Sequence, residues 1–200
     1  MKPLPLSYYQ HEDIVFLARD LLGKSLMTNI GGQGITGGII TETEAYEGPV
    51  DRASHAFGNR HTPRTATMFQ QGGIAYIYLC YGIHHLFNVV TNIGGVPHAV
   101  LIRGLEPTHG LDVMTRRVNP RGGILKDLRG PGKLTRALGI TTQLNATPLT
   151  GDTIWIAGNN LQVPYDQISA TPRIGVDYAG DHALWPYRFV WCCPPRADAR

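Results

Sequence analysis

The chain has 200 residues, of which 42% are hydrophobic and 16% charged, a composition typical of a folded globular protein rather than a disordered one. The length suits one domain with a substantial core. Its apolar runs fall well short of the roughly 18–20 residues that a transmembrane helix needs, and its N-terminus lacks the apolar stretch of a secretory signal. Three cysteines, two of them adjacent, form no plausible disulfide or zinc pattern. We therefore expect one domain over residues 1–200, reduced and cytoplasmic, with a frayed tail after Pro194.

Positive charge is concentrated in residues 116–136. This segment holds seven basic residues and one acid, a formal charge of +6, so the other 179 residues carry −3 of the net charge of +3. A basic cluster on an otherwise mildly acidic protein is expected of a surface that binds phosphates. A solvated charged surface would give the same pattern, so both explanations stay open.

The N-terminal part of the chain reads as a helix followed by two strands. Apolar residues recur every three to four positions over residues 14–22, and Gly23 follows them, which predicts an amphipathic helix and its end. Residues 24–29 and 34–46 are predicted strands. Residues 51–71 are polar and rich in arginine, histidine and threonine, which predicts a long ordered loop with room for a short helical turn. Loops of this length are often functional.

Strands dominate the middle of the chain. Residues 73–81 and 86–91 are predicted to form a hairpin with its tip near Tyr81 and Gly82, and residues 99–105 a third strand. The high content of glycine and proline, 24 and 14 residues, also favours a sheet-rich fold with many turns. The remaining predicted elements are a helix capped by Thr108 that runs through Val118, a helix from Pro131 to a stop at Gly139, and strands at 153–157 and 187–191.

The segment Glu42-Thr43-Glu44-Ala45-Tyr46 is the strongest candidate for chemistry. Side chains alternate along a strand, so both carboxylates and the tyrosine would share one face. Tyr76 and Tyr78 would share a face in the same way. Carboxylates beside an aromatic wall suit a site that holds a flat, electron-poor ligand and does acid–base chemistry on it. A strand glutamate is more often an ion-pair residue, and the tyrosines could equally belong to a core.

Other side chains could reach a ligand from loops and strand ends. Tyr81 at the hairpin tip would be poorly buried, and an exposed aromatic there is suited to wedging into a base stack. His55 and Arg64 belong to the polar loop, where hydrogen bonds to a ligand or phosphate are a better explanation than metal binding. Arg103 at the end of its strand is either an ion-pair residue or a clamp on a carboxylate or phosphate. No phosphate-binding loop or dinucleotide fingerprint is present, so no nucleotide cofactor is indicated.

Taken together, the motifs resemble the alkyladenine (3-methyladenine) DNA glycosylase family, the single-domain type without a helix-hairpin-helix. The resemblance runs from about Leu4 to Trp191, and the ordered series at matching spacing makes it specific. It rests on Glu42–Tyr46, Gly48-Pro49, His55, residues 60–64, Met68-Phe69, Tyr76–Gly82, Asn88 and residues 101–107.

The resemblance implies an α+β fold, a single compact domain with a curved, mainly antiparallel sheet, flanking helices and a protruding β-hairpin. It implies a monomeric enzyme of base excision repair that needs no metal and no other cofactor, and no membrane partner. Such enzymes bind the minor groove of double-stranded DNA, flip a damaged purine into a pocket and hydrolyse its N-glycosidic bond.

The family's functional residues can be carried over one by one. Glu44 matches the general base that activates water, and Arg103 matches an active-site arginine near that water. The base pocket would comprise Tyr46, His55, Tyr78 and, at its floor, Asn88. Tyr81 matches the residue that fills the gap in the duplex, and the candidates for phosphate contacts are Arg60, Arg64 and Lys133.

The chemistry of an alkylated purine fits these roles. Alkylation of a ring nitrogen makes the base cationic, so tyrosine faces attract it and it leaves readily. The reaction then needs little help from a second carboxylate, and Glu42, one pleat away, is expected to be an arginine partner. No lysine lies within residues 44–81, which predicts a monofunctional glycosylase without lyase activity.

Two other functions would use part of the same pattern. A nucleic-acid-binding module without catalysis would need the basic segment but not Glu44. A hydrolase of small nucleosides would need neither Tyr81 nor the basic segment.

Overall fold

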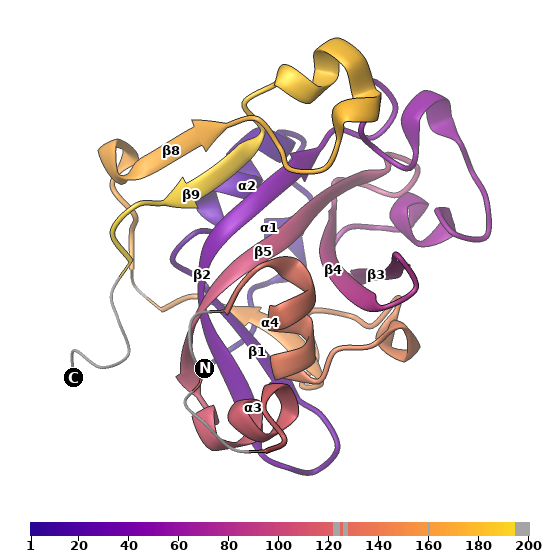
Figure 1. The fold of residues 1–200 in the computed structure, drawn as a ribbon. Coiled ribbons are helices and arrows are strands. Elements are labelled where there is room, and N and C mark those ends of the chain that lie inside the picture. The colour runs from indigo at the N-terminus through magenta and orange to yellow at the C-terminus, as the bar shows by residue number, and fades with distance from the viewer. Residues whose placement is uncertain (122–124, 126–127, 160, 195–200) are drawn as a thin grey trace.

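An antiparallel sheet is the centre of the computed structural model, which describes residues 1–121, 125, 128–159 and 161–194 (Figure 1). The helices in this part of the chain are α1 (Leu6–Tyr9), α2 (Ile14–Asp20), α3 (Leu111–Val118) and α4 (Pro131–Leu138), with short 3-10 helices between them. The strands are β1 (Ser25–Asn29), β2 (Ile35–Tyr46), β3 (Ala75–Cys80), β4 (His84–Thr91), β5 (His98–His109), β6 (Leu128–Arg129), β7 (Ile154–Ala157), β8 (Ile168–Thr171) and β9 (Arg188–Trp191).

The nine described strands form one sheet in the order β3-β4-β5-β2-β1-β7, with β6 paired to β5, β9 to β2 and β8 to β9. Every pairing between them is antiparallel. In Figure 1, α2 lies behind β2 while α4 lies in front of β5. The expected α+β class, one compact domain with an antiparallel sheet and flanking helices, is therefore confirmed.

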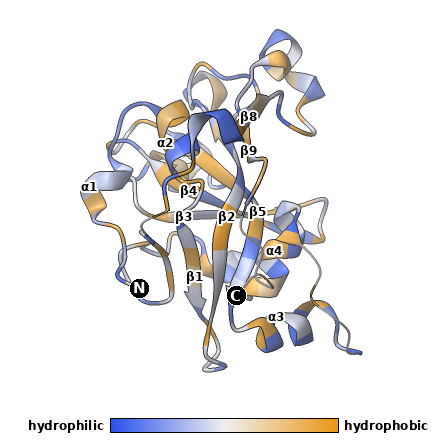
Figure 2. Ribbon diagram, turned by 90° about the vertical axis from the view of Figure 1, so that its left-hand side faces the viewer, coloured by the Kyte–Doolittle hydropathy of each residue, from blue (hydrophilic) through white to orange (hydrophobic). Residues whose placement is uncertain are grey.

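The hydrophobic core joins the sheet to helices α2, α3 and α4. It includes Ile40 of β2, Ile102 of β5, Ala18 of α2 and Leu138 of α4, all fully buried. Figure 2 shows hydrophobic stretches of β2 and β5 in the middle of the molecule. No helix of the described residues combines the length and apolar character needed to cross a bilayer.

The helix ends follow their local sequence, with one exception. The Asp13 side chain accepts a hydrogen bond from the Phe16 N–H at 2.8 Å and caps α2, and Gly139 ends α4 with φ +76°. The prediction that Thr108 caps a helix is wrong, because Thr108 belongs to β5. That strand runs past the predicted end at residue 105, because β2 continues as its partner to Gly37, opposite His109.

Three register irregularities interrupt the pairing of β2 with β5, and two of them lie on either side of Glu42. The pairing skips Thr41 on β2 and Arg103 on β5, so each lies at a bulge. A bulge re-aims side chains and increases local twist. Gly104 lets the strands close here, because a Cβ on it would lie 2.9 Å from the Glu42 Cβ. The result is that Arg103 points toward the carboxylates of β2.

The hairpin β3–β4 ends in a tight turn at Tyr81 and Gly82. The Ile83 N–H donates to the Cys80 carbonyl at 3.1 Å, and the two central residues have φ +51° and +71°. Positive φ at both central residues is typical of the two-residue turns whose twist matches that of the flanking strands. A bulky side chain is strained at such a position. Tyr81 is 87% exposed, as predicted for the tip.

Several short elements were not predicted from the sequence, namely α1, β6 and β8. They have two to four residues each, too few for a periodic pattern to show. The predicted loop 51–71 contains two 3-10 turns, Phe57–Asn59 and Ala66–Phe69. The predicted frayed tail, and Lys126 and Asp127 of the basic segment, lie outside the described residues.

Candidate active site

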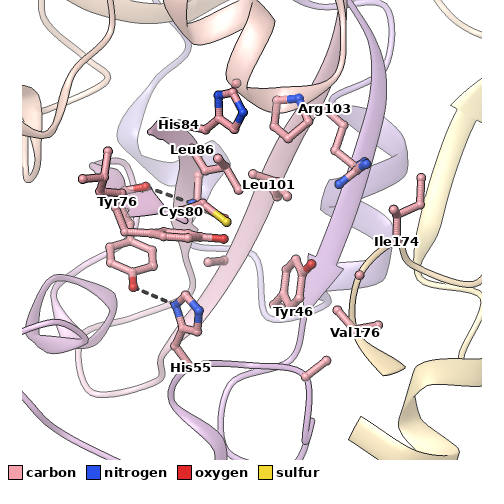
Figure 3. A pocket seen from close by; sticks show the side chains of 18 of the residues that line it. Tyr46, His55, Tyr76, Cys80, His84, Leu86, Leu101, Arg103, Ile174 and Val176 are labelled. Carbon is pink, nitrogen blue, oxygen red and sulfur yellow. Dashed lines mark hydrogen bonds between the residues drawn. The ribbon is translucent and has the colours of Figure 1, made fainter. Parts of the chain in front are cut away.

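A cavity of about 690 Å³ opens between the β3–β4 hairpin, β5, the start of α4 and residues 174–178 (Figure 3). Tyr46 and Arg103 lie on one side of it, and Tyr76 and His55 on the other. A volume of this order is typical of sites for small molecules or single bases. The cavity brings together predicted site residues from β2, β3, β4, β5 and the long loop.

Glu44 lies directly behind the cavity wall and is fully buried. Its Oε1 accepts the Ile174 N–H at 2.9 Å, and its Oε2 accepts the Tyr46 hydroxyl at 2.8 Å. The Arg103 Nη1 lies 3.4 Å from Oε2. Burial raises the pKa of this carboxyl, and the Arg103 charge and the two hydrogen bonds oppose that rise. Glu44 is thus a desolvated carboxylate held by three donors, as expected of a tuned acid or base.

Arg103 bridges the two carboxylates of β2. Its Nε lies 3.0 Å from Glu42 Oε1 and 3.3 Å from Glu44 Oε1, and its side chain also borders the cavity. Glu42 receives a second arginine, Arg188, at 2.7 Å. The expectation that Glu42 is an arginine partner is confirmed, and Arg103 combines the ion-pair role with a position at the pocket.

The aromatic wall consists of Tyr76, Tyr78 and His55. The two tyrosine rings lie 5.5 Å apart, on one strand face as predicted, and the His55 ring lies edge-on to Tyr78 at 4.7 Å. His55 Nδ1 lies 2.9 Å from the Tyr76 hydroxyl, and Nε2 accepts a hydrogen bond from Arg64 at 3.3 Å. Because arginine can only donate, the neutral ring carries its proton on Nδ1. Burial and the nearby arginines lower the pKa of His55 to about 4, so the ring is neutral at pH 7.

Two further candidate residues, Asn88 and Arg64, border the cavity, and only Arg64 lies elsewhere than expected from the sequence. Asn88 is buried at the cavity, with its Nδ2 donating to the Tyr76 carbonyl at 3.0 Å, so its amide is fixed. Arg64, expected at phosphates, borders the cavity with its guanidinium 5.1 Å from the Tyr78 ring centre. Arg60 is exposed on the loop and does not border the cavity.

Lys133 also borders the cavity, although it follows Tyr78 by 55 positions. It lies in the first turn of α4, which packs against β4 and β5. The absence of lysine from residues 44–81 therefore does not exclude a lysine at the cavity. An ammonium group at the mouth can meet a phosphate or an aldehyde carbon equally well.

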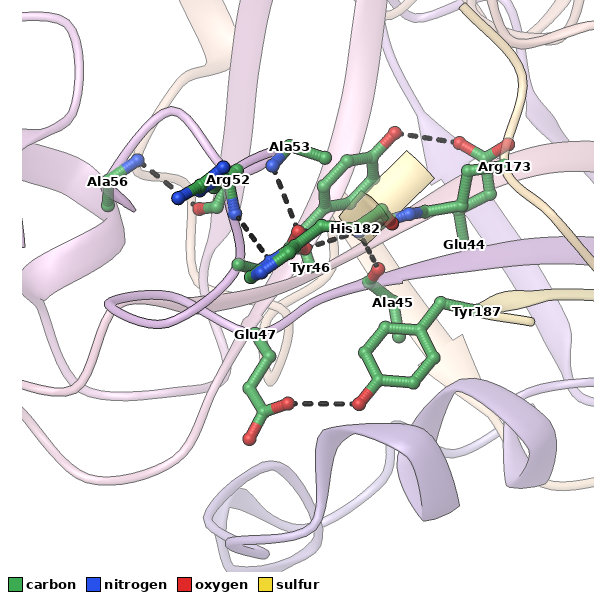
Figure 4. Close-up of polar contacts among 12 residues, drawn as sticks. Glu44, Ala45, Tyr46, Glu47, Arg52, Ala53, Ala56, Arg173, His182 and Tyr187 are labelled. Carbon is green, nitrogen blue, oxygen red and sulfur yellow. Dashed lines mark hydrogen bonds and ion pairs between the residues drawn. The ribbon is translucent and has the colours of Figure 1, made fainter. Parts of the chain in front are cut away.

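Sequence reasoning also missed Arg173, whose polar contacts lie among those shown in Figure 4. Arg173 Nη2 donates to Asp51 Oδ1 at 2.9 Å, and its Nη1 bonds Asp51 Oδ2 and the Ala45 carbonyl. The guanidinium also lies 4.8 Å from the Tyr46 ring centre. No local pattern marks this pair, because its members are far apart in sequence and both lie outside regular elements.

Comparison with known proteins decides the family. A model of the methylpurine-DNA glycosylase family matches residues 7–193. The chain belongs to this family. It is therefore a DNA glycosylase, a hydrolase of N-glycosyl bonds, which confirms the resemblance seen in the sequence.

Similar proteins of several bacteria bear the name "Putative 3-methyladenine DNA glycosylase". The Chlamydia felis relative is 46% identical over 190 residues, covering 94% of this chain and 95% of the relative. The Bacillus licheniformis relative is 44% identical over 189 residues, covering 94% and 92%. The glycosylase family thus accounts for nearly the whole chain, including the residues that border the cavity.

Proposed function

We propose that the protein is a monofunctional DNA glycosylase of base excision repair that acts on alkylated or deaminated purines, 3-methyladenine among them. The damaged nucleotide flips into the cavity, and a water activated by Glu44 hydrolyses its N-glycosidic bond, leaving an abasic site. The observation that carries this proposal is the buried Glu44 carboxylate, held by Tyr46, Arg103 and the Ile174 N–H beside a base-sized aromatic cavity.

Glu44 suits the role of general base because its pKa is raised from the ordinary value. A base is most efficient when its pKa approaches the working pH, provided that it stays ionised. Arg103 supplies the positive charge that keeps it ionised, and it would stabilise the negative charge of the attacking water's oxygen. Catalytic hydrogen bonds often form only in the substrate complex, so the water would bind as the sugar enters beside Tyr46 and Arg103.

The base would lie among Tyr46, Tyr78 and His55, above Asn88. Stacking of a cationic base on tyrosine faces contributes roughly 0.5–2 kcal/mol. A neutral His55 adds no positive charge against such a base, and the lowered pKa of this ring keeps it neutral. The fixed Asn88 amide would disfavour the exocyclic amino group of normal guanine at the pocket floor.

The hairpin would approach the DNA through the minor groove, with Tyr81 filling the gap left by the flipped nucleotide. Its exposure and strained φ support this role, because strained residues persist where function requires them. Arg60, Arg64 and Lys133 would neutralise backbone phosphates, with the enzyme binding as a monomer.

Lys133 makes the absence of lyase activity a separate, testable part of the proposal. A lyase would join the lysine Nζ to C1′ of the opened abasic sugar, and borohydride would reduce that imine to a stable adduct. We expect no adduct, because the Glu44-bound water is the nucleophile. An adduct that disappears in Lys133→Ala would overturn monofunctionality while leaving base release intact.

The main test compares wild type with Glu44→Gln on duplexes that carry 3-methyladenine, 7-methylguanine, hypoxanthine or ethenoadenine. The variant cannot act as a base, so base release should fall by about 10²–10⁴-fold while binding persists. Glu47→Gln is the matched control, since Glu47 bonds the Tyr187 hydroxyl at 3.0 Å and does not border the cavity.

Two outcomes would contradict the proposal. Unchanged base release in Glu44→Gln would remove Glu44 from the mechanism. Equally fast cleavage of free methylated nucleosides would instead indicate a nucleoside hydrolase, which needs no duplex.

A further inference from the structure

A second cavity, of about 620 Å³, lies beside the base pocket at the tip of the β3–β4 hairpin. Ile83, His84 and His85 contribute the hairpin side, and α4, its flanking residues and the end of α3 contribute the other. This side of the cavity consists of Val118, Gly132, Lys133, Thr135, Arg136, Gly139, Ile140 and Thr141.

The pleat of β4 points His84 and His85 to opposite faces of the hairpin, and the two cavities adjoin at His84, Gly132 and Lys133, which border both. His84 pairs with Cys80 and shares a face with Tyr78, toward the base pocket. His85 points to the other face, where its Nδ1 accepts the Thr142 N–H at 3.2 Å. His84 borders both cavities, and it packs so closely on α4 that a Cβ on Gly132 would lie 2.8 Å from its ring. His84 of the hairpin, together with Gly132 and Lys133 of α4, therefore lies between the base pocket and the second cavity.

The second cavity is cationic. Lys133 and Arg136 border it together with the two histidines, and no carboxylate appears among its described lining residues. Arg136 is exposed, and its Nε donates to the Arg117 carbonyl at 2.9 Å, which orients the guanidinium. Arg117, by contrast, is held inside the fold by the Ala137 and Ile30 carbonyls. Only part of the basic segment 116–136 is thus available to a ligand, and Arg136 of that part faces this cavity.

A duplex that presents a flipped nucleotide to the base pocket must place its other strand beyond the hairpin tip. Either groove of DNA is bounded by one backbone of each strand, and a wedge that enters the groove has one backbone on each side. The damaged strand lies on the side of the base pocket. We infer that the second cavity binds the phosphate backbone of the complementary strand, with Arg136 as its principal contact. This inference rests on the proposed function, which supplies the orientation of the damaged strand.

The test compares Arg136→Gln with Arg116→Gln in the full-length protein. Both changes remove one exposed arginine from the same basic segment, but Arg116 borders neither cavity and pairs with Asp112 at 3.1 Å. The ligands are a duplex with a tetrahydrofuran abasic analogue, which cannot be turned over, and the same strand alone. Arg136→Gln should weaken duplex binding about three- to fivefold and reduce the salt slope by about one, with little effect on the single strand. Arg116→Gln should match wild type on both.

Removing the charge of selected DNA phosphates shows which strand Arg136 contacts. Methylphosphonates in the complementary strand opposite the analogue should weaken wild-type binding but leave Arg136→Gln unchanged, since the partner charge is already absent. Methylphosphonates in the damaged strand should weaken both proteins equally.

Three results would overturn the inference. The first is that Arg136→Gln binds the duplex as tightly as wild type does. The second is that it loses the same affinity for the duplex and for the single strand. The third is that only methylphosphonates in the damaged strand lose their effect on binding in Arg136→Gln. Failure of the proposed function would look different: base release from every lesion would be absent, while these binding measurements would still report whether the duplex occupies the second cavity.

Discussion

Asp51 and Arg173 form a fully buried ion pair that joins two segments beside the candidate active-site cavity. Ala53, Ser54 and His55 follow Asp51 in the long loop and border the cavity. Ile174, Gly175 and Val176 follow Arg173 and border it too. The peptide N–H next to Arg173, that of Ile174, is also a donor to Glu44. One ion pair therefore fixes the loop that carries His55 and the backbone that donates to Glu44.

We expect loss of either partner to destabilise the fold and to impair catalysis. Arg173→Met should lower the free energy of unfolding by about 3–5 kcal/mol, because it leaves the Asp51 carboxylate buried without its counter-charge. Asp51→Asn should have a similar effect through Arg173. Denaturant unfolding measures both, and base release is compared at a temperature where each variant remains folded.

The double variant Asp51→Asn with Arg173→Met separates the buried charge from simple loss of packing. It should be less destabilised than the sum of the single variants, since neither charge is then left alone. Losses below about 1 kcal/mol in the single variants would contradict a structural role for the pair.

Tyr81 offers a test in which stability and activity move in opposite directions. Its φ of +51° strains a bulky residue, whereas asparagine is favoured at this position of the turn. Tyr81→Asn should leave the free energy of unfolding unchanged or raise it by up to about 1 kcal/mol. Thermal unfolding measures this change. Base release from duplex DNA should fall, because asparagine cannot fill the place of a flipped base.

A single-stranded lesion substrate is the control for Tyr81→Asn, since it has no stack to invade. The variant should act on it at the wild-type rate. Equal losses on both substrates would assign Tyr81 to the pocket rather than to the duplex gap.

Short-range patterns predicted much of the site. Strand alternation alone places Glu42, Glu44 and Tyr46 on one face and Tyr76 and Tyr78 on another, and the structure has both arrangements. The glycine after Tyr81 predicted the hairpin tip. These features depend on residues within a few positions of each other, so the local sequence is sufficient.

The features that the sequence did not predict depend on distant contacts. The bulge at Arg103 results from pairing with β2, and the Asp51–Arg173 pair joins loops 122 positions apart. Lys133 reaches the cavity only because α4 packs across β4 and β5. Each of these three features depends on tertiary packing, which the hydrophobic pattern of a single segment does not predict.

The raised pKa of Glu44 predicts how activity and stability depend on pH. For a lesion with a fixed positive charge, such as 7-methylguanine, no acid is needed, so base release should follow ionisation of Glu44 alone. The rate should be constant at neutral and alkaline pH and fall below a midpoint that lies above 4.5, the ordinary value for glutamate. Rates are corrected for release without enzyme at each pH. A rate that rises as the solution becomes more acidic would contradict this role.

Stability should show the opposite preference. The folded carboxyl binds its proton more tightly than the unfolded one, so ionisation of Glu44 reduces the free energy of unfolding. This loss is absent below pH 4.5 and complete once the pH exceeds the raised folded pKa. Glu44→Gln has no such ionisation, so its advantage in thermal unfolding over wild type should be larger at pH 8 than at pH 4. A difference that does not change with pH would mean that Glu44 titrates alike in the folded and unfolded chains, and the acid limb of the rate profile would then belong to another group.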